Sequence, residues 1–171
     1  GRLRGGMSSP VVLVLASGRP GYAALEARLA NAWPPSTVGI VRGIAVATAL
    51  AQHLRKMELR YTYRFVFIPG TIGAITWLAL NEAHVGRVKH GFVLTCAGDS
   101  GAMTYKRSRR GNTEIDRAWS YVLEQSGEPY EIQEFSPYGY DERQYCSPGF
   151  NLPIGTVMRT PFGRFAEYHS S

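Results

Sequence analysis

The sequence predicts an α/β domain with a mixed, mostly parallel central sheet flanked by helices on both faces. Strand-like and helix-like segments alternate along the chain, which is the order found in α/β proteins. The strand-like segments are apolar on both faces, as expected for strands that helices cover on both sides. The chain has 171 residues, of which 44% are hydrophobic and 19% charged, and this suffices for one globular domain.

The first 42 residues differ in composition from the rest of the chain, since they contain no Lys, Asp or Phe. Residues 11–17, VVLVLAS, are typical of a buried strand, and residues 22–33, YAALEARLANAW, are typical of a short helix. The PPSTVG segment that follows breaks the pattern. We therefore treat residues 1–42 as an atypical N-terminal segment and residues 43–171 as the α/β domain.

From Gly43 the pattern is clearer. Apolar residues recur at three- and four-residue steps over 43–60, which predicts an amphipathic helix. Residues 61–69, YTYRFVFIP, are rich in β-branched and aromatic residues and end in proline, which predicts a central strand. A second helix is expected over 71–84, with Thr71 as its N-cap.

The alternation continues in the second half of the chain. A third helix is predicted over 112–127, with Asn112 or Thr113 as its N-cap and Gly127 at its end. The remaining strands are expected over 89–98, 101–108, 130–135 and 152–160. Sites in such sheets form where loops leave the carboxyl ends of strands, which directs attention to 69–73, 98–101 and 136–148.

The net charge of +6 does not predict nucleic-acid binding. Residues 1–42 carry five Arg and one Glu (+4), so residues 43–171 carry 14 basic and 12 acidic residues (+2). The basic cluster YKRSRRG, residues 105–111, is expected to be a solvated turn. No apolar run approaches the ~20 residues of a membrane span, and no leader peptide is expected. Two cysteines without a CxxC spacing predict reduced thiols and a cytoplasmic protein.

Two residues are candidates for metal ligation. Asp99 follows a predicted buried strand and is flanked by Gly98 and Gly101. Its carboxylate can ligate a metal, orient a base, or accept backbone N–H bonds in an Asx-turn. His169, near the end of the chain, can ligate zinc through its imidazole or lie in solvent. The other three histidines form no HxxxH or HxH pair and are expected to be structural.

The segment SPYGYDERQYCSPGFNLP, residues 136–153, places Asp141, Glu142 and Arg143 beside Tyr145, among glycines and prolines. Arg143 can bind a carboxylate through its planar guanidinium or neutralise its acidic neighbours. Tyrosine rings with polar tips are suited to lining a pocket. We interpret these four residues as one wall of a substrate-binding site. The sequence contains no nucleophile elbow, phosphate loop or paired CxxC motif.

The runs YTYRFVFIPGTIGAITWL, GDSGAMTYKRSRRG, FSPYGYDERQYCSPGFNLP and EYHSS resemble, in this order, the bacterial aminopeptidase-like domain family over residues 43–171. This family is often encoded beside polysaccharide-biosynthesis genes and is related to the co-catalytic zinc aminopeptidases. The resemblance implies a zinc-exopeptidase-like fold, zinc as cofactor, and Asp99 and His169 as metal ligands. It also implies that the 136–148 loop binds a small-molecule or peptide substrate.

The chain departs from the family pattern before residue 43. Trp33 and Gly39 stand where the family has a histidine ligand and a bridging aspartate, and Gly70 stands about where related peptidases place a catalytic glutamate. The family also continues beyond the EYHSS run. We therefore interpret residues 1–42 as a diverged or frame-shifted replacement, and the α/β domain as incomplete and truncated at its C-terminal end.

These departures predict a fragment or degenerate member of the zinc-dependent aminopeptidase-like hydrolases, which cleave a peptide or amide bond at a free amino terminus. Two ligands are fewer than the three or four of a stable zinc site, so we expect weak or absent zinc binding and activity. Whether the chain is an enzyme stays open. The alternative is a non-catalytic module that binds a small amine or carboxylate ligand in polysaccharide biosynthesis. An unprotected sheet edge left by residues 1–42 would favour a homo-oligomer or an aggregation-prone chain.

Overall fold

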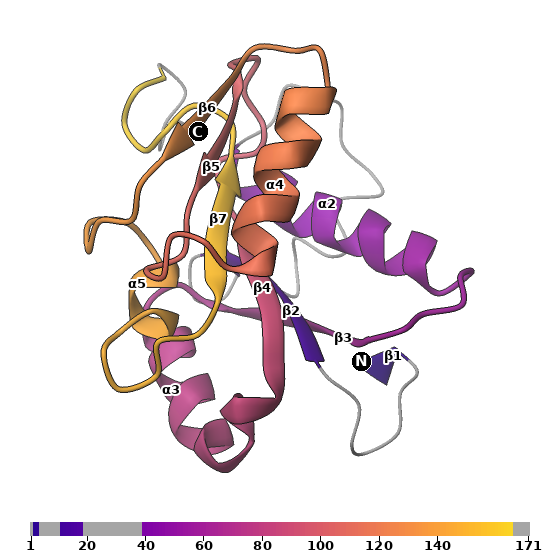
Figure 1. Cartoon of the computed structure of the whole chain (residues 1–171), viewed down its shortest axis with the longest axis vertical. Helices are drawn as coiled ribbons and strands as arrows, with labels where there is room; N and C mark the ends of the chain where they lie inside the picture. The colour runs from indigo at the N-terminus through magenta and orange to yellow at the C-terminus, as the bar shows by residue number, and fades with distance from the viewer. Residues whose placement is uncertain (1, 4–10, 19–38, 166–171) are drawn as a thin grey trace.

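The structure, a computed structural model, describes residues 2–3, 11–18 and 39–165 (Figure 1). These residues form a seven-stranded sheet in the order β1-β3-β2-β4-β7-β5-β6. Its strands are β1 (Arg2–Leu3), β2 (Val11–Gly18), β3 (Thr62–Pro69), β4 (Val88–Leu94), β5 (Met103–Lys106), β6 (Tyr130–Gln133) and β7 (Ile154–Met158). The helices are α2 (Gly39–Leu54), α3 (Ile72–Asn81), the 3-10 helix η1 (Glu82–Arg87), α4 (Glu114–Gln125) and α5 (Glu142–Tyr145).

The sheet is mixed and mostly parallel, as predicted. The pairs β2–β3, β2–β4, β4–β7 and β5–β6 are parallel, whereas β1–β3 and β5–β7 are antiparallel. Parallel neighbours need a crossover connection, and α2 supplies a helix between β2 and β3, as α4 does between β5 and β6. None of the described helices is both long enough and apolar enough to span a bilayer.

The N-terminal segment contributes a central strand. β2 lies between β3 and β4, and its Val14 pairs with Phe65 on one side and Phe92 on the other. β1 pairs with the opposite side of β3. The unprotected edge expected from residues 1–42 therefore does not occur at β3, because this segment joins the same sheet as the rest. The predicted boundary between residues 42 and 43 falls inside α2.

Helices pack on both faces of the sheet (Figure 1). On one face, α3 and α5 cover a core that includes Val66 and Val93. On the other face, α2 and α4 cover a core that includes Phe65 and Leu94. Successive side chains of a strand point to opposite faces, so neighbouring residues of β3 and β4 enter different cores. Each fully buried Val, Leu or Phe contributes about 1.5–3 kcal/mol, which explains why these strands are apolar on both faces.

Helix α4 begins at a capping box. Thr113 is its N-cap, as predicted, and Asp116 is the reciprocal residue. The buried Asp116 carboxylate accepts four hydrogen bonds of 2.6–2.8 Å from the N–H and hydroxyl groups of Ser108 and Thr113. It also accepts one of 2.9 Å from the Tyr105 hydroxyl. Burial alone would raise the pKa of Asp116, but the hydrogen bonds outweigh it and hold the pKa below its usual value.

The other helices differ from prediction at their ends. α2 spans 39–54 rather than 43–60, and α3 ends at Asn81, where η1 continues the chain as a 3-10 helix. Thr71 occupies the predicted N-cap position of α3, but its side chain makes no capping hydrogen bond. Its φ of 62° is unusual for a β-branched residue, and the reason lies in the contacts of the neighbouring loop.

Candidate functional site at the carboxyl ends of the strands

The parallel strands β2, β3, β4 and β7 end at the same edge of the sheet. The chain leaves this edge at residues 70–71 after β3, at 95–102 after β4 and at 159–165 after β7. Tyr140 reaches the same edge, because its ring lies 6.3 Å from the ring of Phe162. These loops form the edge at which the sequence predicts a site.

Asp99 joins two of these loops. Its Oδ2 accepts a hydrogen bond of 2.9 Å from the Gly101 N–H, which closes an Asx-turn, and another from the Thr160 hydroxyl. The Thr160 N–H lies 3.3 Å from both carboxylate oxygens. A Cβ at position 101 would lie 2.1 Å from the Thr160 Oγ1, so this close approach requires glycine. Burial alone would raise the pKa of Asp99, but the bonds from Thr160 and Gly101 outweigh it and lower the pKa.

The loop after β3 is strained at Thr71. Its φ is 62° and its ψ is −68°, and the Ile72 N–H donates to the Gly70 carbonyl at 2.7 Å, so Thr71 is the centre of a γ-turn. Such a backbone conformation costs about 1–3 kcal/mol. The Thr71 N–H donates to the Oδ1 of buried Asp141 at 2.6 Å, and this charge-assisted bond stabilises the turn.

Tyr140 closes the space beside Gly70. A Cβ at position 70 would lie 2.0 Å from the Tyr140 hydroxyl oxygen. The hydroxyl therefore occupies the space that a side chain at position 70 would enter. Gly70 stands about where related peptidases of the wider superfamily have a catalytic glutamate, and a glycine is compatible with the aminopeptidase-like family itself; in this chain a tyrosine hydroxyl packs against it.

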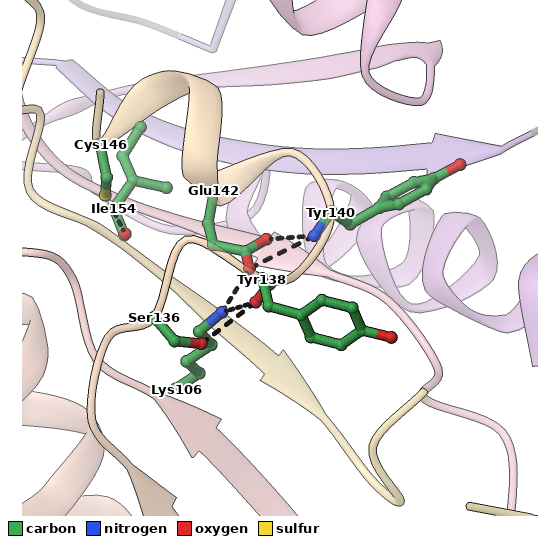
Figure 2. A network of polar contacts seen from close by, with 7 residues as sticks. All are labelled: Lys106, Ser136, Tyr138, Tyr140, Glu142, Cys146 and Ile154. Atoms are coloured by element: carbon green, nitrogen blue, oxygen red, sulfur yellow. Dashed lines mark hydrogen bonds and ion pairs between the residues drawn. The ribbon is translucent and has the colours of Figure 1, made fainter. Parts of the chain in front are cut away.

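Glu142 and Lys106 form a buried ion pair (Figure 2). The Lys106 Nζ lies 2.9 Å from the Glu142 Oε1, and the two side chains are 4% and 0% exposed. Lys106 also donates to the Tyr138 carbonyl, while Glu142 accepts from the Tyr140 N–H at 3.1 Å. The rings of Tyr138 and Tyr140 point away from the ion pair (Figure 2). The pair therefore fixes the backbone of this loop onto the end of β5.

Of the four residues predicted to line a substrate site, Arg143 alone is exposed. Asp141 and Glu142 are buried and bound to groups of the protein itself. Tyr145 is buried with its ring 5.9 Å from that of Trp77. Burial, and then the charge of Asp141, raise the pKa of Tyr145 well above its usual range. A role for these residues in substrate binding stays a prediction, and the contacts described for the three buried ones are internal.

The described residues do not fit a zinc centre by themselves. Within the described ranges, no three His, Cys, Asp or Glu side chains are grouped so that they could hold a metal ion. The described partners of Asp99 are N–H and O–H donors, and its Oδ2 already accepts hydrogen bonds from the Gly101 N–H, the Thr160 hydroxyl and the Thr160 N–H. Glu142 faces the Lys106 ammonium group, which would repel a cation. His169 lies outside the described residues, so its predicted place beside Asp99 stays a prediction.

The sequence reasoning missed two residues that bind the predicted site residues, Lys106 and Thr160. Lys106 belongs to the cluster predicted to be a solvated turn, but it is only 3% exposed, whereas Arg109 and Arg110 are exposed as expected. The available signal was the predicted strand over 101–108, which places Lys106 inside a strand. Thr160 gives no local signal, because its partner Asp99 lies 61 residues away.

Residues 34–171 match the sequence model of a family described as a domain of unknown function, DUF4910. A protein of Clostridium acetobutylicum, named for polysaccharide biosynthesis and an aminopeptidase-like domain, is 47% identical to this chain over 129 residues. The match covers 75% of this chain and 30% of that protein. The chain therefore spans less than a third of the length of this relative.

A crystal structure from Clostridium acetobutylicum, described as that of a peptidase, is similar with a TM-score of 0.81 and 36% identity, over 98% of this chain and 36% of that one. An aminopeptidase of Aneurinibacillus sp. strain AM-1 has a TM-score of 0.70 at 15% identity, over 97% of this chain and 39% of its own. The LapA aminopeptidase of Legionella pneumophila has a TM-score of 0.68 at 10% identity, over 96% of this chain and 44% of that one. These likenesses confirm the predicted α/β fold class and the resemblance to the aminopeptidase-like family.

Proposed function

The chain belongs to the DUF4910 domain family, and from this membership we propose that it is an aminopeptidase-like domain with weak or absent peptidase activity as it stands. By descent it would be a zinc-dependent hydrolase of peptide or amide bonds at a free amino terminus. The names of its relatives, an aminopeptidase-like domain protein and a peptidase, support the peptidase part of this proposal. The observation that carries the proposed loss of activity is the Asp99 carboxylate, which is bound to Gly101 and Thr160.

The chemistry of the donor set supports this proposal. A zinc ion in such a fold lowers the pKa of a bound water and supplies hydroxide near neutral pH. To bind the zinc ion, Asp99 would have to give up its hydrogen bond from the Thr160 hydroxyl. Asp99 and His169 together would supply two ligands, whereas a stable zinc site usually has three or four. Gly70 has no side chain to act as a base, and the Tyr140 hydroxyl occupies the adjacent space.

Zinc titration and hydrolysis of leucine p-nitroanilide test this proposal. We expect no sub-micromolar zinc binding and no zinc-dependent hydrolysis above the level of the Asp99→Asn variant. The same variant should also lose about 1–3 kcal/mol of unfolding free energy and unfold at a lower temperature, because the charge-assisted bonds to Thr160 are lost. Sub-micromolar zinc affinity that Asp99→Asn abolishes would overturn the proposal.

We place this domain in the cytoplasm and in polysaccharide biosynthesis, with a small molecule or a peptide as its substrate. The two cysteines are free and buried, which suits a reducing compartment. The pathway rests on the name of the Clostridium acetobutylicum relative. Recovery of the native protein in the soluble fraction with both thiols reduced is the expected result, and an oxidised, exported form would contradict it.

A second candidate function is the binding of a small carboxylate ligand without catalysis. A hollow of about 220 Å³ is lined by two arginines and two carboxylates, together with uncharged residues: Arg107, Arg117, Asp116, Glu124, Gly111, Asn112, Ser120 and Tyr121. The Arg117 Nη1 donates to the Asn112 carbonyl at 2.8 Å, which orients its guanidinium group. A guanidinium fork matches a carboxylate through two parallel hydrogen bonds.

Calorimetric titration with succinate in the presence of a chelator tests the second candidate. Binding that Arg117→Gln weakens and that the exposed control Arg164→Gln leaves unchanged would support a binding module. Equal binding by both variants would reject it.

A further inference from the structure

Two charged side chains of helix α4, Arg117 and Glu124, line the hollow of about 220 Å³ and have no partner of opposite charge among the described residues. Arg117 uses one of its five N–H groups, on Nη1, to bind the Asn112 carbonyl. The Glu124 carboxylate accepts no hydrogen bond from the described part of the chain. Seven residues separate the two side chains, about 10 Å along a helix, and they form no ion pair with each other.

The other two charged groups that line the hollow are bound within the protein. The buried Asp116 carboxylate accepts the five hydrogen bonds of the capping region described above. The Arg107 Nη1 lies 3.3 Å from the Glu134 Oε1. These contacts occupy Asp116 and Arg107, so Arg117 and Glu124 are the two charges in the hollow that remain for a ligand.

The C-terminal end of α4 favours a cation. The last carbonyl groups of a helix carry partial negative charge, and a basic side chain usually lies near them. The last turn of α4 has no basic residue, and Glu124 adds a full negative charge there. A ligand with an ammonium group beside Glu124 would compensate both the carboxylate and the carbonyl groups.

We propose that the hollow binds a linear zwitterion, with the carboxylate of the ligand at Arg117 and its ammonium group at Glu124. This proposal rests on the second candidate function and adds a positive charge to the carboxylate ligand considered there. With about 10 Å between the two positions on the helix and a charge-assisted bond of about 2.8 Å at each end, the charges of the ligand lie about 5–10 Å apart. The hollow is smaller than the ~300–1,000 Å³ pockets of drug-sized ligands, so the ligand is a short chain.

The surface between the two charges suits the middle of such a chain. Arg117, Ser120, Tyr121 and Glu124 are spaced i, i+3, i+4 and i+7, which places them on one side of α4. The Tyr121 side chain is 64% exposed, and its ring offers an apolar surface to methylene groups. An α-amino acid, whose two charges are on adjacent carbons, does not reach both Arg117 and Glu124.

The hollow is separate from the edge at which Asp99 lies. It is formed by α4 and the segment that joins β5 to α4 (Figure 1). β5 is antiparallel to β7, so this segment leaves β5 on the side away from the carboxyl end of β7. Zwitterion binding therefore does not depend on zinc or on peptidase activity.

NMR titration of the ¹⁵N-labelled chain in the presence of a chelator tests the proposal with three probes. 6-Aminohexanoate has both charges at opposite ends, hexanoate lacks the ammonium group, and 2-aminohexanoate is an isomer with adjacent charges. We expect 6-aminohexanoate to bind about fivefold or more tightly than the other two, which is the upper end of the contribution of an exposed ion pair. The largest shifts should occur at the amides of residues 117–124.

The variant Glu124→Gln separates this proposal from the second candidate function. It should lower the affinity for 6-aminohexanoate to that for hexanoate and leave hexanoate binding unchanged. The matched control is Glu128→Gln, an exposed carboxylate that does not line the hollow, and it should bind all three probes as the parent does. Circular dichroism should show an unchanged fold for both variants, since both side chains are exposed.

Equal binding of 6-aminohexanoate and hexanoate by the parent would overturn the zwitterion. So would equal binding of the two isomers, or a Glu124→Gln variant that keeps the preference for 6-aminohexanoate. If Arg117→Gln still weakens succinate binding in that case, the second candidate function survives alone. If Arg117→Gln weakens the binding of neither succinate nor 6-aminohexanoate, both proposals are rejected.

Discussion

Replacing Lys106 with methionine should strongly destabilise the domain. The substitution keeps the length of the side chain but leaves the Glu142 carboxylate, which is 0% exposed, without the ammonium group 2.9 Å away. Removing one partner of a buried ion pair costs about 3–5 kcal/mol, because the remaining charge is desolvated and uncompensated. In a domain of this size, 1 kcal/mol corresponds to about 2–4 °C in Tm, so Lys106→Met should lower Tm by roughly 6–20 °C.

Thermal and urea unfolding at pH 7 measure this effect. The matched control is Lys56→Met, since Lys56 is exposed and its loss should change stability by less than about 0.5 kcal/mol. The double variant Lys106→Met/Glu142→Met removes both charges and should recover most of the loss, because replacing a complete buried pair by apolar residues is often neutral. A Lys106→Met variant that unfolds within about 1 kcal/mol of the parent would refute the reasoning, and so would a double variant no more stable than Lys106→Met.

Three further predictions concern the core. Asp116→Asn should lower the free energy of unfolding by about 2–4 kcal/mol at pH 7. Folding lowers the pKa of Asp116, so its contribution to stability is present above the unfolded value of 3.8 and is lost as the pH falls through the lower folded value. Acid unfolding curves should therefore show the stabilities of the parent and the variant converging. Gly155→Ala should lower the free energy of unfolding by about 1–3 kcal/mol, because the new Cβ would lie 2.2 Å from the Tyr105 hydroxyl oxygen. The control Gly86→Ala, whose Cβ would have no atom within 4 Å, should leave the unfolding free energy unchanged. Both cysteines should react with a thiol reagent only after unfolding, since burial raises their pKa values and excludes the reagent; rapid native labelling would contradict this.

The fold class could be predicted because its determinants are local in sequence. β3 is apolar on both faces because α2 and α3 cover it from opposite sides, and that pattern is visible within residues 61–69. The start of α4 could be predicted for the same reason, since Thr113 and Asp116 are three residues apart. Helix ends were less predictable: α2 ends at Leu54, although the apolar spacing in the sequence continues to Met57.

The contacts of the candidate site could not be predicted because its partners are distant in sequence. Lys106 and Glu142 are 36 residues apart, and Asp99 and Thr160 are 61 apart. A local pattern shows that a carboxylate follows a strand or lies in a loop. It does not show whether that carboxylate faces a ligand or a residue from another loop. For Asp99, the Asx-turn that the sequence left open is the contact that forms.

Two of the three described non-glycine residues with positive φ lie at this edge, where the carboxylates bind other parts of the protein. Thr71 and Cys96 follow the ends of β3 and β4 and have positive φ values of 62° and 41°. Non-glycine residues keep such angles only where their surroundings impose them, and they cluster at ligand sites. At Thr71 the surroundings are the Asp141 carboxylate, and at Cys96 the carbonyl accepts a hydrogen bond of 2.9 Å from the Arg159 N–H. At both positions the strained backbone is therefore held by hydrogen bonds from within the protein.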